Sequence, residues 1–311
     1  MPIKIPDGLP ARKTLEEEGV LLINEERAIV QDIRPMRTAI VNLMPEKIKT
    51  ETQLARVLGS TPLQVEMTLI SMASHTPKNT SAQHLLDFYR PLIEIQNQKF
   101  DGLIVTGAPI EQLPFEDVTY WEELGEIFNW SLTNAHSNFH LCWGGQAALN
   151  HFYDIPKHQL PQKRFGIYTH RVLDHTSLLM RGLNDEIPIP VSRHTENRIE
   201  DFANFGHLQV LMDSEEAGMC MVLDHKLRHV HMFNHMEYDS TTIGDEYQRD
   251  VAKGDDIQLP ANYYPDDDPS KVPINTWRGN GHLLFGNWLN YVYQTTHYDL
   301  EEIGTDRERI R

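Results

Sequence analysis

Buried strands alternating with amphipathic helices dominate the first half of the chain. The predicted strands are nearly continuous apolar runs at 37–44, 63–72, 100–107 and 138–142. The segments between them carry apolar side chains at helical spacing, at 50–58, 83–98 and 118–133. This alternation predicts an α/β fold, with a mostly parallel sheet flanked by helices on both faces.

The second half of the chain is richer in strands. Strands are expected at 166–173, 187–192, 208–212, 219–223 and 228–235, followed by a Pro/Asp-rich loop at 256–273 and an aromatic-rich amphipathic helix at 280–295. No internal repeat or low-complexity linker divides the sequence. We therefore expect a single α/β domain over 1–311, with an acidic N-terminal arm (1–35), a catalytic core (36–297) and a C-terminal tail (298–311).

Charge and cysteine content narrow the class of protein. The 311 residues carry a net charge of −17, which argues against nucleic acid and anionic membranes as partners. No apolar run reaches transmembrane length, and the N-terminus lacks a signal-peptide core. Only two cysteines occur, so no disulfide framework is expected, which fits a cytoplasmic protein. Cys220 lies in an apolar run and is expected to be buried and inert.

Cys142 is the most informative residue of the chain. It ends the apolar run in the segment FHLCWGGQAA at 139–148, and two glycines and helix-forming residues follow it. This pattern predicts a nucleophile elbow, a sharp turn from a strand into a helix with the reactive side chain at the corner. The helix dipole then favours the thiolate, and the backbone N–H of Trp143 points to where an acyl oxygen would become negative.

A base for this nucleophile lies in the segment RHVHMFNHMEY at 228–238, whose alternating residues predict a strand. His235 and Glu237 are two residues apart, so they project from the same face. A cysteine nucleophile needs a base that takes or returns a proton and a carboxylate that orients this base. We therefore interpret Cys142, His235 and Glu237 as the catalytic residues.

A metal site is the alternative interpretation of this strand. Several potential zinc ligands lie on one face or close to it, namely His225, His229, His231, His235 and Glu237. A metal would explain the histidines but would leave the cysteine elbow without a role. We therefore expect no metal at the site, and we interpret His229 and His231 as ordinary polar residues at a sheet edge.

The cysteine elbow followed by His-x-Glu on a later strand resembles the class I glutamine amidotransferase-like fold, which is flavodoxin-like. The loop TGAPIE at 106–111 follows a buried strand, so it is expected at the carboxyl edge of the sheet, where ligands bind in such folds. In the amidotransferase-like fold the corresponding loop supplies the second oxyanion donor. The resemblance therefore implies the backbone N–H of Ala108 beside that of Trp143.

Six motifs in this order carry a more specific resemblance, at 41–47, 106–109, 140–144, 165–166, 192–196 and 234–238. With them the chain resembles, over nearly its whole length, the homoserine O-acyltransferases of methionine biosynthesis. The resemblance implies Cys142 as the acyl-thioester nucleophile, His235 as the general base and Glu237 as its orienting carboxylate. It also implies substrate contacts at Lys163, Ser192 and Arg249, and a homodimer.

The expected reaction is ping-pong transfer of an acetyl group from acetyl-CoA to L-homoserine, which needs no metal or redox cofactor. Glu111 follows the oxyanion loop, and family members with glutamate here tend to use acetyl-CoA, whereas those with glycine tend to use succinyl-CoA. Three alternatives remain: a homoserine O-succinyltransferase, a glutamine amidotransferase or glutaminase, and a non-enzymatic binder of a small molecule. The intact Cys–His–Glu set argues against a non-enzymatic binder.

Overall fold

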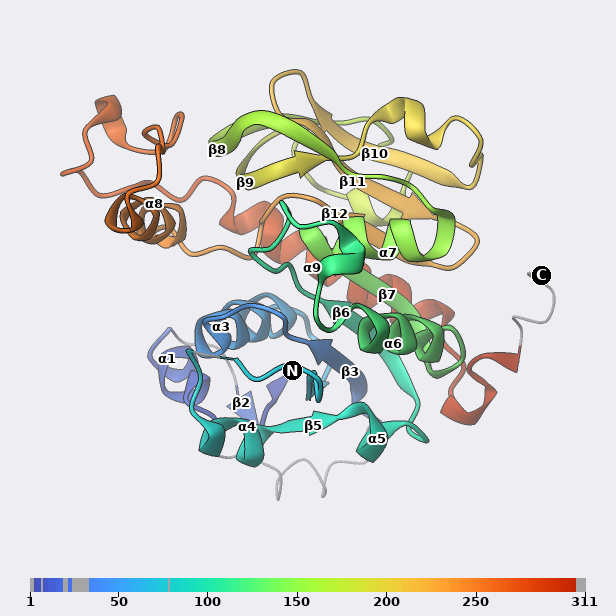
Figure 1. Cartoon of the computed structure of the whole chain (residues 1–311). Coiled ribbons are helices and arrows are strands. Elements are labelled where there is room, and N and C mark those ends of the chain that lie inside the picture. Colours follow the sequence, from blue (N-terminus) through green and yellow to red (C-terminus); the bar gives the residue numbers. More distant parts are fainter. Residues whose placement is uncertain (1–2, 7, 19–21, 24–33, 78, 306–311) are drawn as a thin grey trace.

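The computed structural model describes residues 3–6, 8–18, 22–23, 34–77 and 79–305, and one twisted sheet connects them (Figure 1). The strand order is β2-β1-β4-β3-β6-β7-β12-β11-β10-β8-β9, and β5 pairs with β4. The sheet is parallel from β2 through β12 and antiparallel from β12 to β9. The predicted mostly parallel α/β architecture is confirmed.

The parallel part of the sheet contains the apolar runs that the sequence predicts as strands. Its strands are β1 Ile3–Lys4, β2 Leu22–Ile23, β3 Met36–Val41, β4 Val65–Ser71, β5 Tyr89–Pro91, β6 Phe100–Val105, β7 Ala135–Leu141 and β12 His229–Met232. Every residue of β6 and β7 is buried, because helices cover both faces there. The centre of the sheet is therefore the best-buried part of the fold.

The antiparallel part lies in the upper half of Figure 1. Its strands are β8 His158–Val172, β9 Glu186–Glu196, β10 Leu208–Ser214 and β11 Gly218–Asp224. The strands β8 and β9 are longer than the sequence predicts, and they curve away from the parallel part. Residues of both strands line a cavity beside the carboxyl ends of β6 and β7.

Helices cover the sheet on both faces. They are α1 Ala11–Glu17, α3 Lys47–Leu58, α4 Ala82–Phe88, α5 Leu92–Ile95, α6 Trp121–Asn134, α7 Trp143–Tyr153, α8 Thr242–Lys253 and α9 Arg278–Thr295. On one face Phe139 of β7 stacks on Phe285 of α9, with ring centroids 5.0 Å apart. On the other face α6 and α7 pack against β7. No helix of the described ranges is long and apolar enough to cross a membrane.

Two predicted elements are wrong. The single helix predicted at 83–98 is divided into α4, the edge strand β5 and α5, because Tyr89 pairs with Leu69 of β4. The strand predicted at 228–235 ends at Met232, so His235 and Glu237 lie in the segment that follows it.

The start of the chain packs into the core where the structure describes it. Ile5, Leu9 and Leu15 are at most 1% exposed and belong to the main hydrophobic cluster. The described part of the segment 1–35, which the sequence suggests as an arm, is therefore integrated into the fold. Much of the rest, including 24–33, lies outside the described residues.

Candidate active site

Cys142 stands at a sharp turn between β7 and α7. Its backbone has φ 49° and ψ −122°, a conformation that non-glycine residues rarely adopt. The Cys142 N–H donates to the carbonyl of Met232 on the neighbouring strand at 2.7 Å, which anchors the turn to the sheet. Strain of this kind at a half-buried thiol is typical of functional positions, and here it presents the thiol at the N-terminus of α7.

Two glycines allow other backbone segments to approach the turn. A Cβ added at Gly144 would lie 2.6 Å from the Thr106 carbonyl oxygen, and one added at Gly107 would lie 2.9 Å from the Cβ of Cys142. Neither contact is sterically possible, so only glycine lets the loop after β6 lie against the elbow. Ala108, the residue that follows this loop's glycine, lines the same cavity as Cys142.

His235 and Glu237 form a buried pair. The distance between His235 Nδ1 and Glu237 Oε1 is 2.6 Å, and both side chains are about 95% buried. The thiol of Cys142 lines the same cavity and interacts with His235. Burial alone would lower the pKa of His235, but Glu237 and Cys142 raise this pKa well above its usual value of 6.5. The arrangement therefore favours an imidazolium beside the sulfur.

Three further polar side chains connect the surroundings of the His235–Glu237 pair to α8, namely Tyr238, Ser192 and Glu246. The Tyr238 hydroxyl donates to Glu246 Oε1 at 2.8 Å, and the Ser192 hydroxyl donates to Glu246 Oε2 at 2.5 Å. Burial and the neighbouring carboxylates raise the pKa of Tyr238 well above 10, so this hydroxyl stays a donor. Both oxygens of Glu246 are thus fixed by neutral donors, and its negative charge faces the cavity.

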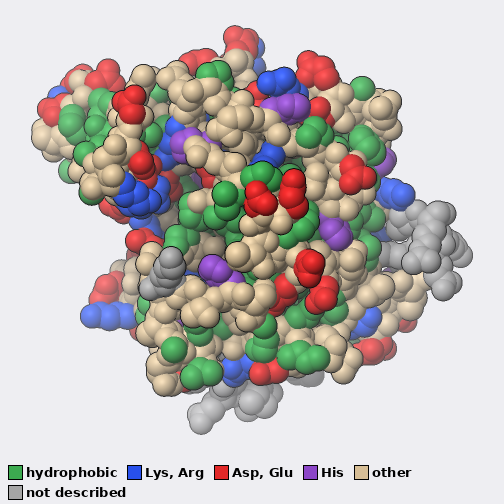
Figure 2. All heavy atoms as spheres, in the orientation of Figure 1, with side chains coloured by type: hydrophobic (Ala, Val, Ile, Leu, Met, Phe, Trp, Pro, Cys, Tyr) green, Lys and Arg blue, Asp and Glu red, His purple; other side chains and the backbone are tan. Residues whose placement is uncertain are grey.

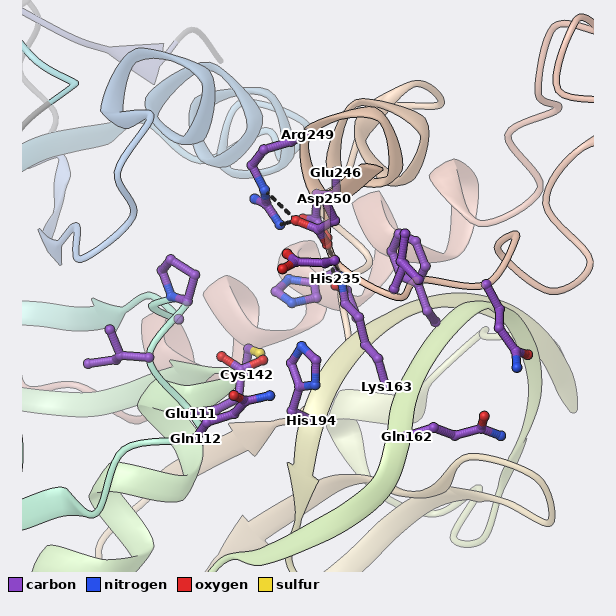
Figure 3. Close-up of a pocket in the computed structure, with 18 of the residues that line it drawn as sticks. Glu111, Gln112, Cys142, Gln162, Lys163, His194, His235, Glu246, Arg249 and Asp250 are labelled. Atoms are coloured by element: carbon purple, nitrogen blue, oxygen red, sulfur yellow. Dashed lines mark hydrogen bonds and ion pairs between the residues drawn. The ribbon is translucent and has the colours of Figure 1, made fainter. Parts of the chain in front are cut away.

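Lys163 and Arg249 share one carboxylate. Lys163 Nζ lies 2.8 Å from Asp250 Oδ2, and the Nε and Nη2 atoms of Arg249 lie 2.8 and 2.7 Å from Asp250 Oδ1. Burial would raise the pKa of Asp250, but these two cations hold it below its usual value. Figure 3 shows the three side chains at the rim of the same pocket as Cys142 and His235. The side chain of Arg249 is 40% exposed, so it remains reachable by an anionic ligand.

A cavity of about 860 Å³ joins these groups, and most of the site residues predicted from the sequence line it. The lining includes Ala108, Glu111, Cys142, Lys163, Ser192, His235 and Arg249. Trp143 and Glu237 support the site from behind, and Trp143 is fully buried. Lys157 donates to the backbone carbonyls of Glu111 and Leu113, which fixes the main chain of the loop that carries Glu111.

Sequence reasoning missed Tyr238, Glu246 and Asp250. The signal was present, because Glu246, Arg249 and Asp250 have the helical i, i+3, i+4 spacing and therefore share one face of α8. The helix itself was not predicted. Its face could be connected to the cysteine only through the fold.

The interpretation of His229 and His231 as residues at a sheet edge is wrong. Their strand, β12, lies in the interior of the sheet between β7 and β11, and both side chains are fully buried. The alternative metal set is also not formed. The ring nitrogens of His229 and His231 meet those of His140 on β7, whereas His235 and Glu237 lie in the catalytic cavity region.

The architecture and the elbow define a class I glutamine amidotransferase-like fold. A glutamine amidotransferase from Thermotoga maritima is similar with a TM-score of 0.56 at 12% identity, over 85% of this chain and all of that one. A glutamine amido transferase from Methylobacillus flagellatus has a TM-score of 0.52 at 12% identity, over 86% of this chain and 98% of that one. At such low identity the likeness shows the fold alone.

Sequence similarity is more specific. The family model for homoserine O-succinyltransferase matches residues 2–298, and the chain belongs to this family. A relative from Hyphomonas neptunium is 54% identical over 304 residues, 98% of this chain and all of the relative. One from Ruegeria is 52% identical over 311 residues, the full length of both. Both relatives are named homoserine O-acetyltransferase. The fold and family predicted from the sequence are confirmed.

Proposed function

We propose that the protein is a homoserine O-acetyltransferase, which moves an acetyl group from acetyl-CoA to the γ-hydroxyl of L-homoserine through a thioester on Cys142. One observation carries the proposal. The strained Cys142, the His235–Glu237 pair and Glu111 surround one cavity. The family and the names of the relatives support homoserine acyl transfer and the acetyl donor.

In the first half-reaction the Cys142 thiolate attacks the carbonyl carbon of acetyl-CoA. The oxygen becomes negative, and the backbone N–H groups of Trp143 and Ala108 stabilise it. The intermediate collapses, the bond from carbon to the CoA sulfur breaks, and the His235 imidazolium protonates the leaving thiolate. The products are free CoA, an acetyl thioester on Cys142 and a neutral His235.

In the second half-reaction homoserine enters the same cavity. The neutral His235 accepts the proton of the γ-hydroxyl as its oxygen attacks the thioester carbon. The Cys142 sulfur leaves as a thiolate beside the imidazolium, which restores the starting pair. Glu237 holds the imidazole in the tautomer that presents Nε2 to the reacting groups, and it stabilises the imidazolium.

The amino acid end of homoserine carries a carboxylate and an ammonium group, and the cavity rim offers both charges. Arg249 and Lys163 suit the carboxylate, while Ser192 holds Glu246 in place on the same side of the cavity. Asp250 bonds both of these cations. Substrate binding therefore has to compete with Asp250 for part of their hydrogen bonds.

Three further expectations belong to the proposal. Acyl transfer from thioester to thiol to hydroxyl requires no resident cofactor. The resemblance suggests a homodimer. A reducing cytoplasm would keep Cys142 and Cys220 as the free thiols that the structure describes.

The acyl-enzyme tests the proposal directly. The protein is incubated with acetyl-CoA in the absence of homoserine, and intact and peptide mass spectrometry follow. We expect one added acetyl group on Cys142, which homoserine then removes as O-acetylhomoserine. The buried Cys220 serves as the internal control, since burial raises its thiol pKa to about 12. An adduct on Cys220, an active Cys142→Ala enzyme, or ammonia release from glutamine would overturn the proposal.

A further inference from the structure

Three histidine side chains meet beneath α7, outside the catalytic cavity. His231 of β12 pairs in register with His140 of β7, and His229 lies one strand repeat earlier on the same face. The ring centroids of His229 and His231 lie 5.1 and 4.9 Å from that of His140. All three side chains are 0% exposed. We call this group the tri-histidine cluster.

The surroundings of the cluster are mostly apolar. The ring of His140 packs edge-on against Phe128 of α6, and the ring of His229 packs against Phe152 of α7. Neither ring nitrogen of His140 has a hydrogen-bond partner among the described residues. A buried polar atom without a partner is unfavourable, and native proteins rarely leave one so. A ligand that bonds a ring nitrogen of His140 would therefore be favourable here.

A metal ion is the group that fits. Each histidine offers one nitrogen, and these ligand atoms all lie within 4.8 Å of one another. Zinc–nitrogen bonds of about 2.0–2.1 Å place tetrahedral ligand atoms roughly 3.3 Å apart, so small rotations of the rings would close the site.

We propose that His140, His229 and His231 form a structural site for a divalent transition metal ion, which in the cell is zinc. Imidazole nitrogen is a preferred ligand for this ion. Asp224, fully buried and in register with His229, supplies a negative charge next to the site. The Tyr153 hydroxyl and two backbone N–H groups hold its carboxylate in place.

The position of the site suggests what the ion does. His140 is two residues before Cys142, and His231 is four residues before His235. An ion bound by both would tie the strand that carries the nucleophile to the strand that leads to the base. Because the cluster is closed to solvent, the ion would enter as the chain folds and would resist removal from the native protein.

The test is the metal content of the full-length protein, produced in zinc-supplemented medium and dialysed against a chelator in the native state. We expect about one zinc per chain by elemental analysis, and less than a tenth of this in His140→Leu. His225→Leu is the matched control, because His225 is exposed on the turn just before β12. Cys142→Ala must retain the zinc, since the catalytic thiol is not a ligand. Refolding from denaturant with zinc should raise Tm and the recovered activity above refolding with chelator.

Refolding with cobalt keeps the proposal testable if His140→Leu fails to fold. Tetrahedral nitrogen ligation gives visible cobalt bands without a thiolate charge-transfer band, and a thiolate band would assign the ion to a cysteine instead. The proposal is overturned by wild-type protein that holds no zinc after both expression and refolding with the ion. It is also overturned by zinc that folded His140→Leu retains. Either result would mean that the three histidine rings pack together as neutral side chains without an ion.

Discussion

The ring of Tyr238 stacks on the imidazole of His235, with centroids 4.1 Å apart and an angle of 16° between the planes. Glu237 fixes one edge of the same imidazole through Nδ1. A ring held at its edge and over one face has little freedom to rotate. Tyr238 is therefore a positioning residue for the base, and its hydroxyl connects the base to Glu246 on α8.

Two substitutions of Tyr238 should separate its stacking on His235 from its hydrogen bond to Glu246. Tyr238→Leu removes the stacking, which is worth about 0.5–1.5 kcal/mol for aromatic pairs, and should lower kcat by about 2- to 10-fold. Tyr238→Phe keeps the stacking and loses only the hydrogen bond to Glu246. It should retain most of kcat and raise KM for homoserine. Steady-state kinetics of both variants measure this, and equal effects on kcat would contradict the role of the stacking.

Removal of the base His235 should reduce turnover more than removal of its orienting carboxylate Glu237. His235→Ala should lose about 10²–10⁴-fold in turnover, because general-base catalysis contributes this much. The loss of turnover in Glu237→Ala should be about one to two orders of magnitude smaller than in His235→Ala, since Glu237 transfers no proton in the reaction. Removing Glu237 also lowers the pKa of His235, so iodoacetamide should alkylate Cys142 more slowly at pH 7.

The control for this comparison is His225→Leu, which removes an exposed histidine on the turn before β12, outside the cavity. Its activity should stay far above that of His235→Ala. A His235→Ala enzyme whose turnover equals that of His225→Leu would show that the base is wrongly assigned.

The sequence predicted what depends on local pattern. Runs such as 100–107 are apolar on both faces, so their burial in a parallel sheet follows directly, and the glycines after Cys142 indicate the elbow. The sequence could not predict which strands become neighbours in the sheet. The pairing of β7 with β12 places His140 beside His231. These two residues are 91 positions apart in the sequence, and neither segment alone contains a pattern that indicates the pairing.

The same limit applies to the rim of the cavity. Lys163, Ser192 and Arg249 came from the family resemblance, but their partners Asp250 and Glu246 are visible only after α8 folds against β8 and β9. The prediction of a single helix at 83–98 was wrong for a related reason. Its apolar residues suit a helix, and the edge pairing of Tyr89 with β4 overrides that preference.

His170 should make the protein sensitive to acid. Its Nδ1–H donates to the Tyr168 carbonyl, and its Nε2 accepts from the Asn234 amide at 2.8 Å, so the neutral ring is fully bonded. Burial, with Arg193 nearby, lowers its pKa from 6.5 to about 4. The unfolded chain therefore binds this proton more readily. The stabilisation is complete above pH 6.5 and is lost as the pH falls toward 4.

For this one group the free energy of unfolding should fall by about 2 kcal/mol between pH 7 and pH 5. Urea unfolding at both pH values measures the change, and His170→Gln should show a smaller one. His175→Gln is the control, because His175 is largely exposed, with 58% of its side chain accessible. Equal pH dependence in wild type and His170→Gln would refute the prediction.

Glu111 should set the choice of acyl donor. It lies on the loop after β6 and lines the cavity with Cys142 (Figure 3). Lys157 donates to its backbone carbonyl. A succinyl group ends in a carboxylate that would meet the Glu111 carboxylate. At 4–8 Å and an effective dielectric constant of about 20, the repulsion is about 2–4 kcal/mol. The chain as a whole is acidic, with a net charge of −17, and Figure 2 shows Asp and Glu side chains spread over one face of the molecule.

Glu111→Gly should therefore gain succinyl-CoA use and lose its preference for acetyl-CoA. A repulsion of about 2–4 kcal/mol corresponds to a shift of about 30- to 900-fold in the ratio of kcat/KM for the two donors. Glu111→Gln separates the causes, because it removes the charge and keeps the volume. It should give an intermediate shift if both repulsion and space matter. Gln112→Gly is the matched control, an uncharged and exposed neighbour on the same loop. A wild-type enzyme that prefers succinyl-CoA would show that Glu111 does not select the donor. So would a Glu111→Gly enzyme whose donor ratio equals that of Gln112→Gly.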